Sequence, residues 1–202
     1  MAKLYFRYGA MNSGKTTALM QVAYNYKERG MRVLILKPSI DTKGQDRIVS
    51  RLGIECKVDQ LVTPEVDIVA LVQADIAQSG PLACVLCDES QFFTPAQAEQ
   101  LFLVTVDLSV PVICYGLRAD FMLHGFPGST RLLELAHTIE ELKTICACGR
   151  KAICNGRKVN GEYVFEGAQV AIDTVDNVEY QSLCPQCWYR EYRAFLKRHG
   201  KG

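Results

Sequence analysis

Residues 9–16 combine two glycines, a lysine and a threonine in the spacing G-x-x-x-x-G-K-[ST], a pattern that binds nucleotide phosphates. In this pattern the glycines let backbone N–H groups turn toward a polyphosphate. Lys15 reaches the β and γ oxygens, and the Thr16 hydroxyl ligates Mg²⁺. The sequence therefore predicts a nucleotide-binding loop made of Gly9, Ala10, Met11, Asn12, Ser13, Gly14, Lys15 and Thr16.

A pair of acids directly follows the apolar run at residues 84–87. In phosphoryl-transfer proteins a carboxylate at the end of a strand helps to hold Mg²⁺, and we assign this role to Asp88. Glu89 lies one residue further on, where it can take a proton from an attacking oxygen. Glu89 is therefore the candidate general base. The same pair in an ATPase would activate water, so the acids predict phosphoryl transfer and leave the acceptor open.

Two close pairs of cysteines lie in the last third of the chain. Four thiolates are the ligands that a tetrahedral structural zinc site requires, and such a closed shell leaves no open position for chemistry. The predicted zinc ligands are Cys146, Cys148, Cys184 and Cys187, with Cys154 as the one alternative. The other cysteines are expected to be small buried hydrophobic residues, namely Cys56, Cys84, Cys87 and Cys114.

The elements that must position these residues alternate between strands and helices. Continuous apolar runs predict buried parallel strands, and the segments between them have helical composition. The strand-like runs are residues 4–6, 31–37, 82–87 and 111–115, and the helical segments are 17–24 and 96–106. This order predicts an α/β fold, with a P-loop core built on a parallel sheet that has helices on both faces.

A second unit is predicted from residue 144, where cysteine pairs and short β-prone runs begin. Asn-Gly dipeptides at 155–156 and 160–161 are typical of tight turns between strands. We therefore expect a small β-rich, zinc-binding domain. The predicted division is a P-loop nucleotide-binding core at 1–143, the zinc-binding domain at 144–192, and a flexible tail at 193–202.

The composition favours a small substrate over a nucleic acid or a membrane. The 202 residues are 49% hydrophobic, which is enough for one large core and an appendage. The 23 basic and 22 acidic residues give a net charge of +1, which offers no case for binding a nucleic-acid backbone or an anionic membrane. No stretch approaches the roughly 20 apolar residues of a membrane span. Because Met1 leads straight into the first strand, we expect no signal peptide and a cytoplasmic protein.

Several of these segments together resemble the zinc-bearing, recombinase-like type of thymidine kinase found in bacteria and in the animal cytosol. The resemblance spans nearly the whole chain. It rests on the phosphate loop, the two cysteine pairs, and the segments 88–93 (DESQFF) and 115–121 (YGLRADF). It implies transfer of the ATP γ-phosphate to the 5′-hydroxyl of thymidine, with Glu89 accepting the hydroxyl proton. The implied ligands of ATP and Mg²⁺ are the phosphate loop and Asp88, Glu89, Ser90 and Gln91.

The resemblance also implies that residues 149–183 form a lasso, which closes over the nucleoside and holds the thymine edge with backbone groups. Apolar and aromatic walls suit the base and its methyl group, and closure excludes water from the reaction. The residues implied to line this pocket are Met11, Phe92, Leu117, Phe121 and Tyr180. The chain differs from many members in three places. Residues 172–180 lack a paired glycine, Lys43 replaces a frequent arginine, and Asn155 falls near a position that is often threonine in animal members.

Two further expectations come from the resemblance alone, namely a homotetramer and feedback inhibition by dTTP. Two alternatives stay open. One is a kinase with a broader range of pyrimidine deoxynucleosides, which substrate competition would separate from a thymidine kinase. The other is a P-loop ATPase or switch whose zinc module binds a protein or nucleic acid. The near-neutral charge and the lack of a basic stripe argue against this second alternative.

Overall fold

A computed structural model of the chain describes residues 1–40, 47–49, 53–169 and 177–200. The expectations for Lys43 and for residues 172–176 therefore lie outside the described residues. The chain divides into two compact units. The first unit contains residues 1–8, 14–117 and 126–141, and the second contains residues 9–13, 118–125 and those from 142 onward. The second unit thus includes two segments, 9–13 and 118–125, that the sequence analysis assigned to the core.

The first unit is built on a six-stranded sheet with the strand order β5-β2-β6-β7-β1-β8. Every neighbouring pair in it is parallel. Its four inner strands occupy the predicted apolar runs and are β1 (Leu4–Tyr8), β2 (Val33–Pro38), β6 (Cys84–Cys87) and β7 (Val112–Gly116). The sequence analysis missed the edge strands β5 (Gln60–Val62) and β8 (Thr138–Glu141). Both are short and largely exposed, so they carry no continuous apolar run.

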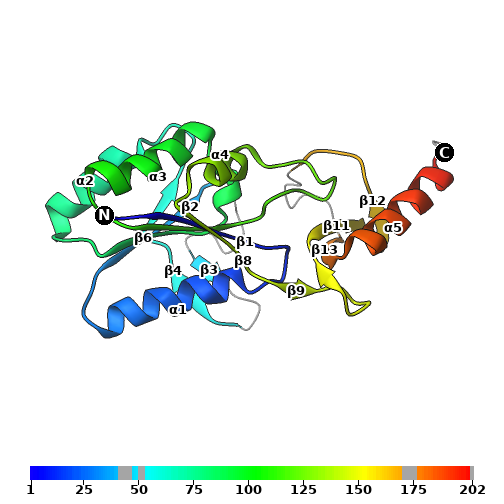
Figure 1. The fold of residues 1–202 in the computed structure, drawn as a ribbon, viewed down its shortest axis with the longest axis horizontal. Coiled ribbons are helices and arrows are strands. Elements are labelled where there is room, and N and C mark those ends of the chain that lie inside the picture. The colour runs from blue at the N-terminus through cyan, green and yellow to red at the C-terminus, as the bar shows by residue number, and fades with distance from the viewer. Residues whose placement is uncertain (41–46, 50–52, 170–176, 201–202) are drawn as a thin grey trace. The chain divides into compact units, whose positions relative to one another are not determined.

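Helices cover both faces of this sheet, as predicted. Helix α1 (Lys15–Glu28) lies on one face, and α2 (Ile68–Ser79), α3 (Pro95–Asp107) and α4 (Pro127–Leu135) lie on the other (Figure 1). Helix α3 begins where local chemistry dictates, because Thr94 and Gln97 form a reciprocal capping box and Pro95 occupies the first turn. A 3₁₀ turn at Ser90–Phe92 precedes it, and β3 (Arg47–Val49) pairs with β4 (Glu55–Lys57) outside the main sheet.

The second unit is β-rich, as the sequence predicts. Strands β9 (Thr144–Ile145) and β10 (Lys151–Ala152) form a hairpin, and β11 (Cys154–Val159), β12 (Glu162–Val164) and β13 (Val178–Leu183) form an antiparallel sheet. Helix α5 (Pro185–Arg198) follows β13. The buried aromatic side chains of Phe165, Trp188 and Phe195 form part of the core of this unit. Helix α5 therefore continues through residues 193–198, where the sequence analysis began a flexible tail.

The two Asn-Gly dipeptides have different outcomes. Asn160 and Gly161 have φ values of 52° and 82° and join β11 to β12, as a two-residue hairpin turn requires. The turn predicted at Asn155-Gly156 is wrong, because both residues lie inside β11 and pair with β13. A side chain at position 156 would require two neighbouring side chains to move. A Cβ atom would lie 2.7 Å from the Leu183 side chain and 2.8 Å from the Tyr163 ring.

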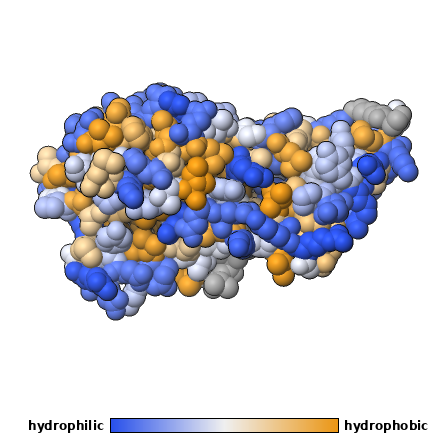
Figure 2. Space-filling model, viewed as in Figure 1, coloured by the Kyte–Doolittle hydropathy of each residue, from blue (hydrophilic) through white to orange (hydrophobic). Residues whose placement is uncertain are grey.

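The surface drawn in Figure 2 intersperses hydrophilic residues with small apolar groups. In the part of the chain that the structure describes, no helix has both the length and the apolar character needed to cross a membrane.

Candidate active site and metal centre

The phosphate loop has the predicted order of strand, loop and helix. Strand β1 ends at Tyr8 and helix α1 begins at Lys15, which is 8% exposed. Gly14 caps the helix with a φ of 78°, in the left-handed region that favours glycine. The loop therefore leads into the N-terminus of α1, where backbone N–H groups and the positive end of the helix dipole favour an anion.

The first glycine of the loop is required for a different reason, which is space. A Cβ atom on Gly9 would lie 2.6 Å from the Leu142 carbonyl oxygen and 2.3 Å from the Ser13 Oγ. The carbonyl belongs to the backbone and has little freedom to move away. Any side chain at position 9 must therefore displace the loop.

We expect Gly9→Ala to weaken Mg·ADP binding by roughly tenfold or more, because the displaced backbone N–H groups would no longer point at the phosphates. Isothermal calorimetry measures this directly. A matched control is Gly30→Ala, which also adds a methyl group but at a positive-φ site in open space after α1. The control should lose some stability and keep its ADP affinity. Equal ADP affinity in the wild type and Gly9→Ala would contradict the proposed close contact.

The two acids lie where the sequence predicts, directly after β6. Asp88 is 4% exposed. Glu89 has φ 45° and ψ 39°, a left-handed conformation that costs a non-glycine residue of order 1–3 kcal/mol. Such strain persists where surrounding contacts fix the backbone, and it is concentrated at functional sites. The strained backbone of Glu89 is therefore consistent with the functional role that the sequence motif predicts.

The Glu89 carboxylate is held by a neighbouring amide. Gln91 Nε2 donates to Glu89 Oε2 at 2.6 Å, and Gln91 Oε1 accepts from the Leu117 N–H at 3.0 Å. Gln91 is 2% exposed, and these two bonds fix which end of its amide faces Glu89. The end of β7 thus orients Gln91, and Gln91 orients Glu89. We expected Gln91 to bind the nucleotide, and its role in orienting Glu89 left no signal in the sequence.

A second side chain, that of Ser90, connects the segment after β6 to the end of β7. Ser90 Oγ donates to the Tyr115 carbonyl at 2.8 Å, and Ser90 is fully buried. Gly116 leaves room for this approach, because a Cβ atom added at position 116 would lie only 2.6 Å from Ser90 Oγ. Phe92 is half-buried and packs edge-on against Phe126, with ring centroids 5.6 Å apart. The first unit therefore gathers these residues at the carboxyl ends of adjacent strands, where ligands bind in open α/β sheets.

The second unit holds the other expected pocket residues. Phe121 is 2% exposed, and the Arg157 guanidinium covers its ring at 3.6 Å from the centroid. Tyr180 is half-buried on β13, opposite Arg157 in the strand register. Arg157 also donates to the carbonyl oxygens of Glu166 and Ala168, each at 2.8 Å. The sequence analysis missed Arg157, because a charged residue in a short strand is normally exposed.

The four predicted cysteine ligands come together in the second unit. Their Sγ atoms all lie within 4.8 Å of one another, and the group comprises Cys146, Cys148, Cys184 and Cys187. Cys148 is the exposed member. The turn that carries the first pair is closed by the Gly149 N–H, which donates to the Cys146 carbonyl at 2.8 Å. Four thiolates at this spacing can hold a metal ion.

Cys154, the alternative ligand, is buried but lies outside the group of four. The backbone N–H of Cys187 lowers the pKa of the Cys184 thiol to about 6, whereas burial raises the pKa of Cys154 to about 11. Neighbouring thiols, Cys148 first, raise the pKa of Cys187 within the cluster to about 12, so position and not thiol acidity separates the four ligands from Cys154. Cys84, Cys87 and Cys114 are fully buried as predicted, and Cys56 differs, because it is only half-buried on a short outer strand.

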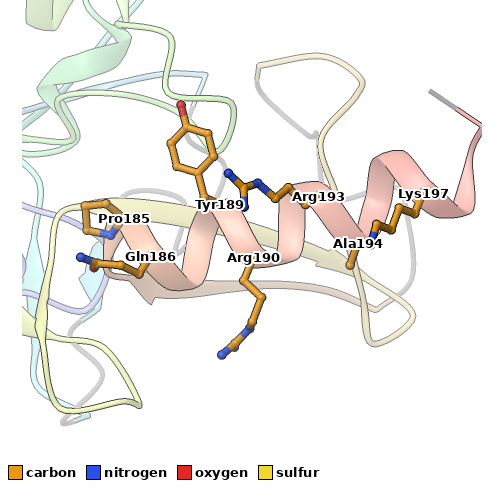
Figure 3. Close-up of a pocket in the computed structure, with 7 residues that line it drawn as sticks. All are labelled: Pro185, Gln186, Tyr189, Arg190, Arg193, Ala194 and Lys197. Atoms are coloured by element: carbon orange, nitrogen blue, oxygen red, sulfur yellow. The ribbon is translucent and has the colours of Figure 1, made fainter. Parts of the chain in front are cut away.

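A surface hollow of about 700 Å³ runs along α5 and contains none of the predicted site residues. It is lined by residues of this one helix, and Figure 3 shows Tyr189 and Arg193 projecting from one side of the helix and Arg190 from the other. Arg190 pairs with Glu191 at 2.9 Å. The hollow is therefore an exposed helix surface, and it lacks the concave walls of a small-molecule site.

Comparison with known proteins identifies the family to which this chain belongs. The family model "Thymidine kinase" matches residues 2–188 of this chain. A thymidine kinase of Ruegeria pomeroyi is 48% identical over 93% of this chain and 94% of its own length. A thymidine kinase of Rhodopirellula baltica is 48% identical over 91% of this chain and 86% of its own length. One of Xanthomonas campestris is 48% identical over 100% of this chain and 94% of its own length. A solved structure of the Pif1 helicase of Candida albicans matches 71% of this chain and 36% of its own chain. Its sequence identity is 11% and its TM-score is 0.41, so the likeness is too weak to support a statement about function. The match to the family model and the near-full-length identity place this chain in the thymidine kinase family.

Proposed function

We propose that this chain transfers the γ-phosphate of ATP to the 5′-hydroxyl of thymidine with Glu89 as the general base, giving thymidine monophosphate for pyrimidine salvage. Family membership over nearly the whole chain supports the reaction. One observation carries the assignment of the base. Glu89 follows a buried acid at the carboxyl end of β6, in a strained backbone conformation, with its carboxylate held by Gln91. A fixed carboxylate is what proton removal from a hydroxyl requires.

The proposed nucleotide ligands are the phosphate loop, Asp88, Glu89, Ser90 and Gln91. Lys15 and the backbone N–H groups at the start of α1 provide positive charge for the phosphates. Thr16 and Asp88 provide oxygen ligands, which suit Mg²⁺, and this ion neutralises developing charge on the phosphates when it is bound. Glu89 accepts the proton as the nucleoside oxygen attacks, while Gln91 keeps the carboxylate in place.

The proposed nucleoside pocket uses Met11, Phe92, Leu117, Phe121 and Tyr180, with residues 149–183 as the lasso. These side chains offer the apolar and aromatic contacts that a pyrimidine base and its methyl group need. Arg157 supports this role for the lasso, because it holds the backbone at Glu166 and Ala168 while covering the ring of Phe121. A closed lasso would exclude the water that competes with the nucleoside for the phosphoryl group.

The cysteine cluster is proposed to hold a structural zinc ion. Zinc–sulfur bonds of about 2.3 Å place tetrahedral sulfur ligands about 3.8 Å apart. The four Sγ atoms lie within 4.8 Å of one another, and those of Cys148 and Cys184 are 3.6 Å apart. The cluster therefore fits zinc with little rearrangement. Four protein ligands complete the shell, which assigns the ion to stability.

Three further proposals rest on the resemblance and on composition. We propose a cytoplasmic homotetramer that dTTP inhibits as the end product. The substrates are thymidine and ATP, with neither nucleic acid nor membrane as a partner, because the charges nearly balance.

The reaction is tested by supplying Mg·ATP with thymidine, deoxyuridine or deoxycytidine and following each monophosphate and free phosphate separately. Thymidine monophosphate should dominate, and added dTTP should suppress it. Comparable products from all three nucleosides would instead indicate a broader pyrimidine deoxynucleoside kinase. Free phosphate without a nucleotide product would overturn the proposal in favour of an ATPase.

A further inference from the structure

Both peptide groups of Met11 are held by side chains of the second unit. The Met11 N–H donates to Asn155 Oδ1 at 2.8 Å, and the Met11 carbonyl accepts from Ser182 Oγ. Asn155 on β11 and Ser182 on β13 are direct partners in the strand register. Because cross-strand partners project from the same face of a sheet, this one pair of residues can bind both the N–H and the carbonyl of Met11.

The contacts of Asn155 are specific to an amide. Its Oδ1 accepts from Met11, while its Nδ2 donates to the Ala119 carbonyl at 2.8 Å. Only one orientation of the amide satisfies a backbone donor on one side and a backbone acceptor on the other. Asn155 itself is 5% exposed, and losing its amide would leave two half-buried backbone groups, on Met11 and Ala119, without these partners. Asn155 thus joins the segments 9–13 and 118–125, which both belong to the second unit.

The rest of residues 9–13 is restrained from the same unit. Asn12 has a φ of 64°, and its carbonyl accepts from Thr144 Oγ1 at 3.4 Å. Gly9 has no room for a side chain against the Leu142 carbonyl. Side chains of β9, β11 and β13 therefore hold the first half of the loop in one shape. A loop whose N–H groups are ordered in advance binds phosphate without first losing conformational entropy.

We propose that Asn155 and Ser182 are positioning residues that preset the phosphate-loop backbone for the nucleotide. This inference rests on the nucleotide-binding role proposed for the loop. It gives the zinc-bearing unit a part in ATP binding as well as in covering the nucleoside. Neither side chain has to touch a substrate for this, because both act through the backbone of Met11.

The test measures Mg·ADP affinity by calorimetry with no nucleoside present. Asn155→Leu keeps a similar volume and removes both amide bonds, and Ser182→Ala removes one hydroxyl bond. Each should weaken Mg·ADP binding by roughly tenfold. Ser182→Thr keeps the hydroxyl in a strand position and should restore nearly wild-type affinity. The matched control is Gln181→Ala, on the adjacent residue, whose exposed side chain bonds to the Tyr163 hydroxyl. It should bind ADP normally.

The outcomes separate this inference from the alternatives. Unchanged Mg·ADP affinity in both Asn155→Leu and Ser182→Ala would overturn it. So would a higher KM for thymidine with unchanged Mg·ADP affinity, because that result would make Asn155 a direct nucleoside contact. A general folding defect would lower the unfolding temperature of Ser182→Thr as much as that of Ser182→Ala, without rescue of binding. If the wild type itself failed to bind Mg·ADP, the proposed role of the loop would fall, and this inference with it.

Discussion

Replacing Glu89 with glutamine should lower kcat about a thousandfold and leave Mg·ADP affinity within about twofold of the wild type. The amide has the size and shape of the carboxylate but cannot accept a proton at neutral pH. Gln91 Nε2 can still donate to the new side-chain oxygen, so the local geometry should persist. Steady-state kinetics for both substrates, together with calorimetry for ADP, separates proton transfer from binding.

A matched control for Glu89→Gln is Glu99→Gln, the same chemical change on the exposed face of α3. Glu99 pairs with Arg131 at 2.9 Å in solvent, where such a pair contributes little to stability. Its kinetics should be unchanged. Nearly normal thymidine phosphorylation by Glu89→Gln would remove Glu89 from the role of base. A loss of ADP affinity with an unchanged kcat at saturating ATP would make Glu89 a nucleotide ligand only.

The parts of the site that the sequence predicted are those fixed by short-range chemistry. The phosphate loop, the acids after β6 and the cysteine pairs each lie within a few residues of chain, where spacing determines geometry. The inner strands were also predictable, because β2, β6 and β7 are buried on both faces and read as continuous apolar runs.

The parts that the sequence could not predict depend on distant partners. Met11 and Asn155 are 144 positions apart, and no periodicity or motif marks that bond. The Asn155-Gly156 dipeptide even gave the wrong signal, because tertiary packing placed a turn-forming pair inside a strand. Gln91 and Arg157 are similar cases. Their roles follow from which backbone groups they meet, and only the folded chain shows those contacts.

Removing one of the four proposed zinc ligands should have the largest effect on stability. Structural zinc sites in small domains contribute of order 10 kcal/mol to folding at neutral pH. We therefore expect Cys184→Ser to lose its zinc and to unfold the second unit well below the unfolding temperature of the wild type. Zinc content is measured by metal analysis, and unfolding by the fluorescence of Trp188. This is the single tryptophan of the chain, 5% exposed, one residue from Cys187.

The control for this experiment is Cys154→Ala, because Cys154 is a buried cysteine of the second unit that lies outside the cluster. It should keep one zinc ion per chain. Loss of zinc from Cys154→Ala, or its full retention in Cys184→Ser, would contradict the ligand assignment.

The zinc ion should also affect nucleotide binding, because of where Ser182 and Trp188 lie along the chain. Ser182 holds the Met11 carbonyl two residues before Cys184, and Trp188 donates to the Phe121 carbonyl at 2.9 Å one residue after Cys187. Loss of the metal should loosen both contacts, so Mg·ADP affinity should fall with zinc content and recover when zinc is restored. A metal-free protein that kept its full Mg·ADP affinity would show that β13 holds the phosphate loop without help from the metal site.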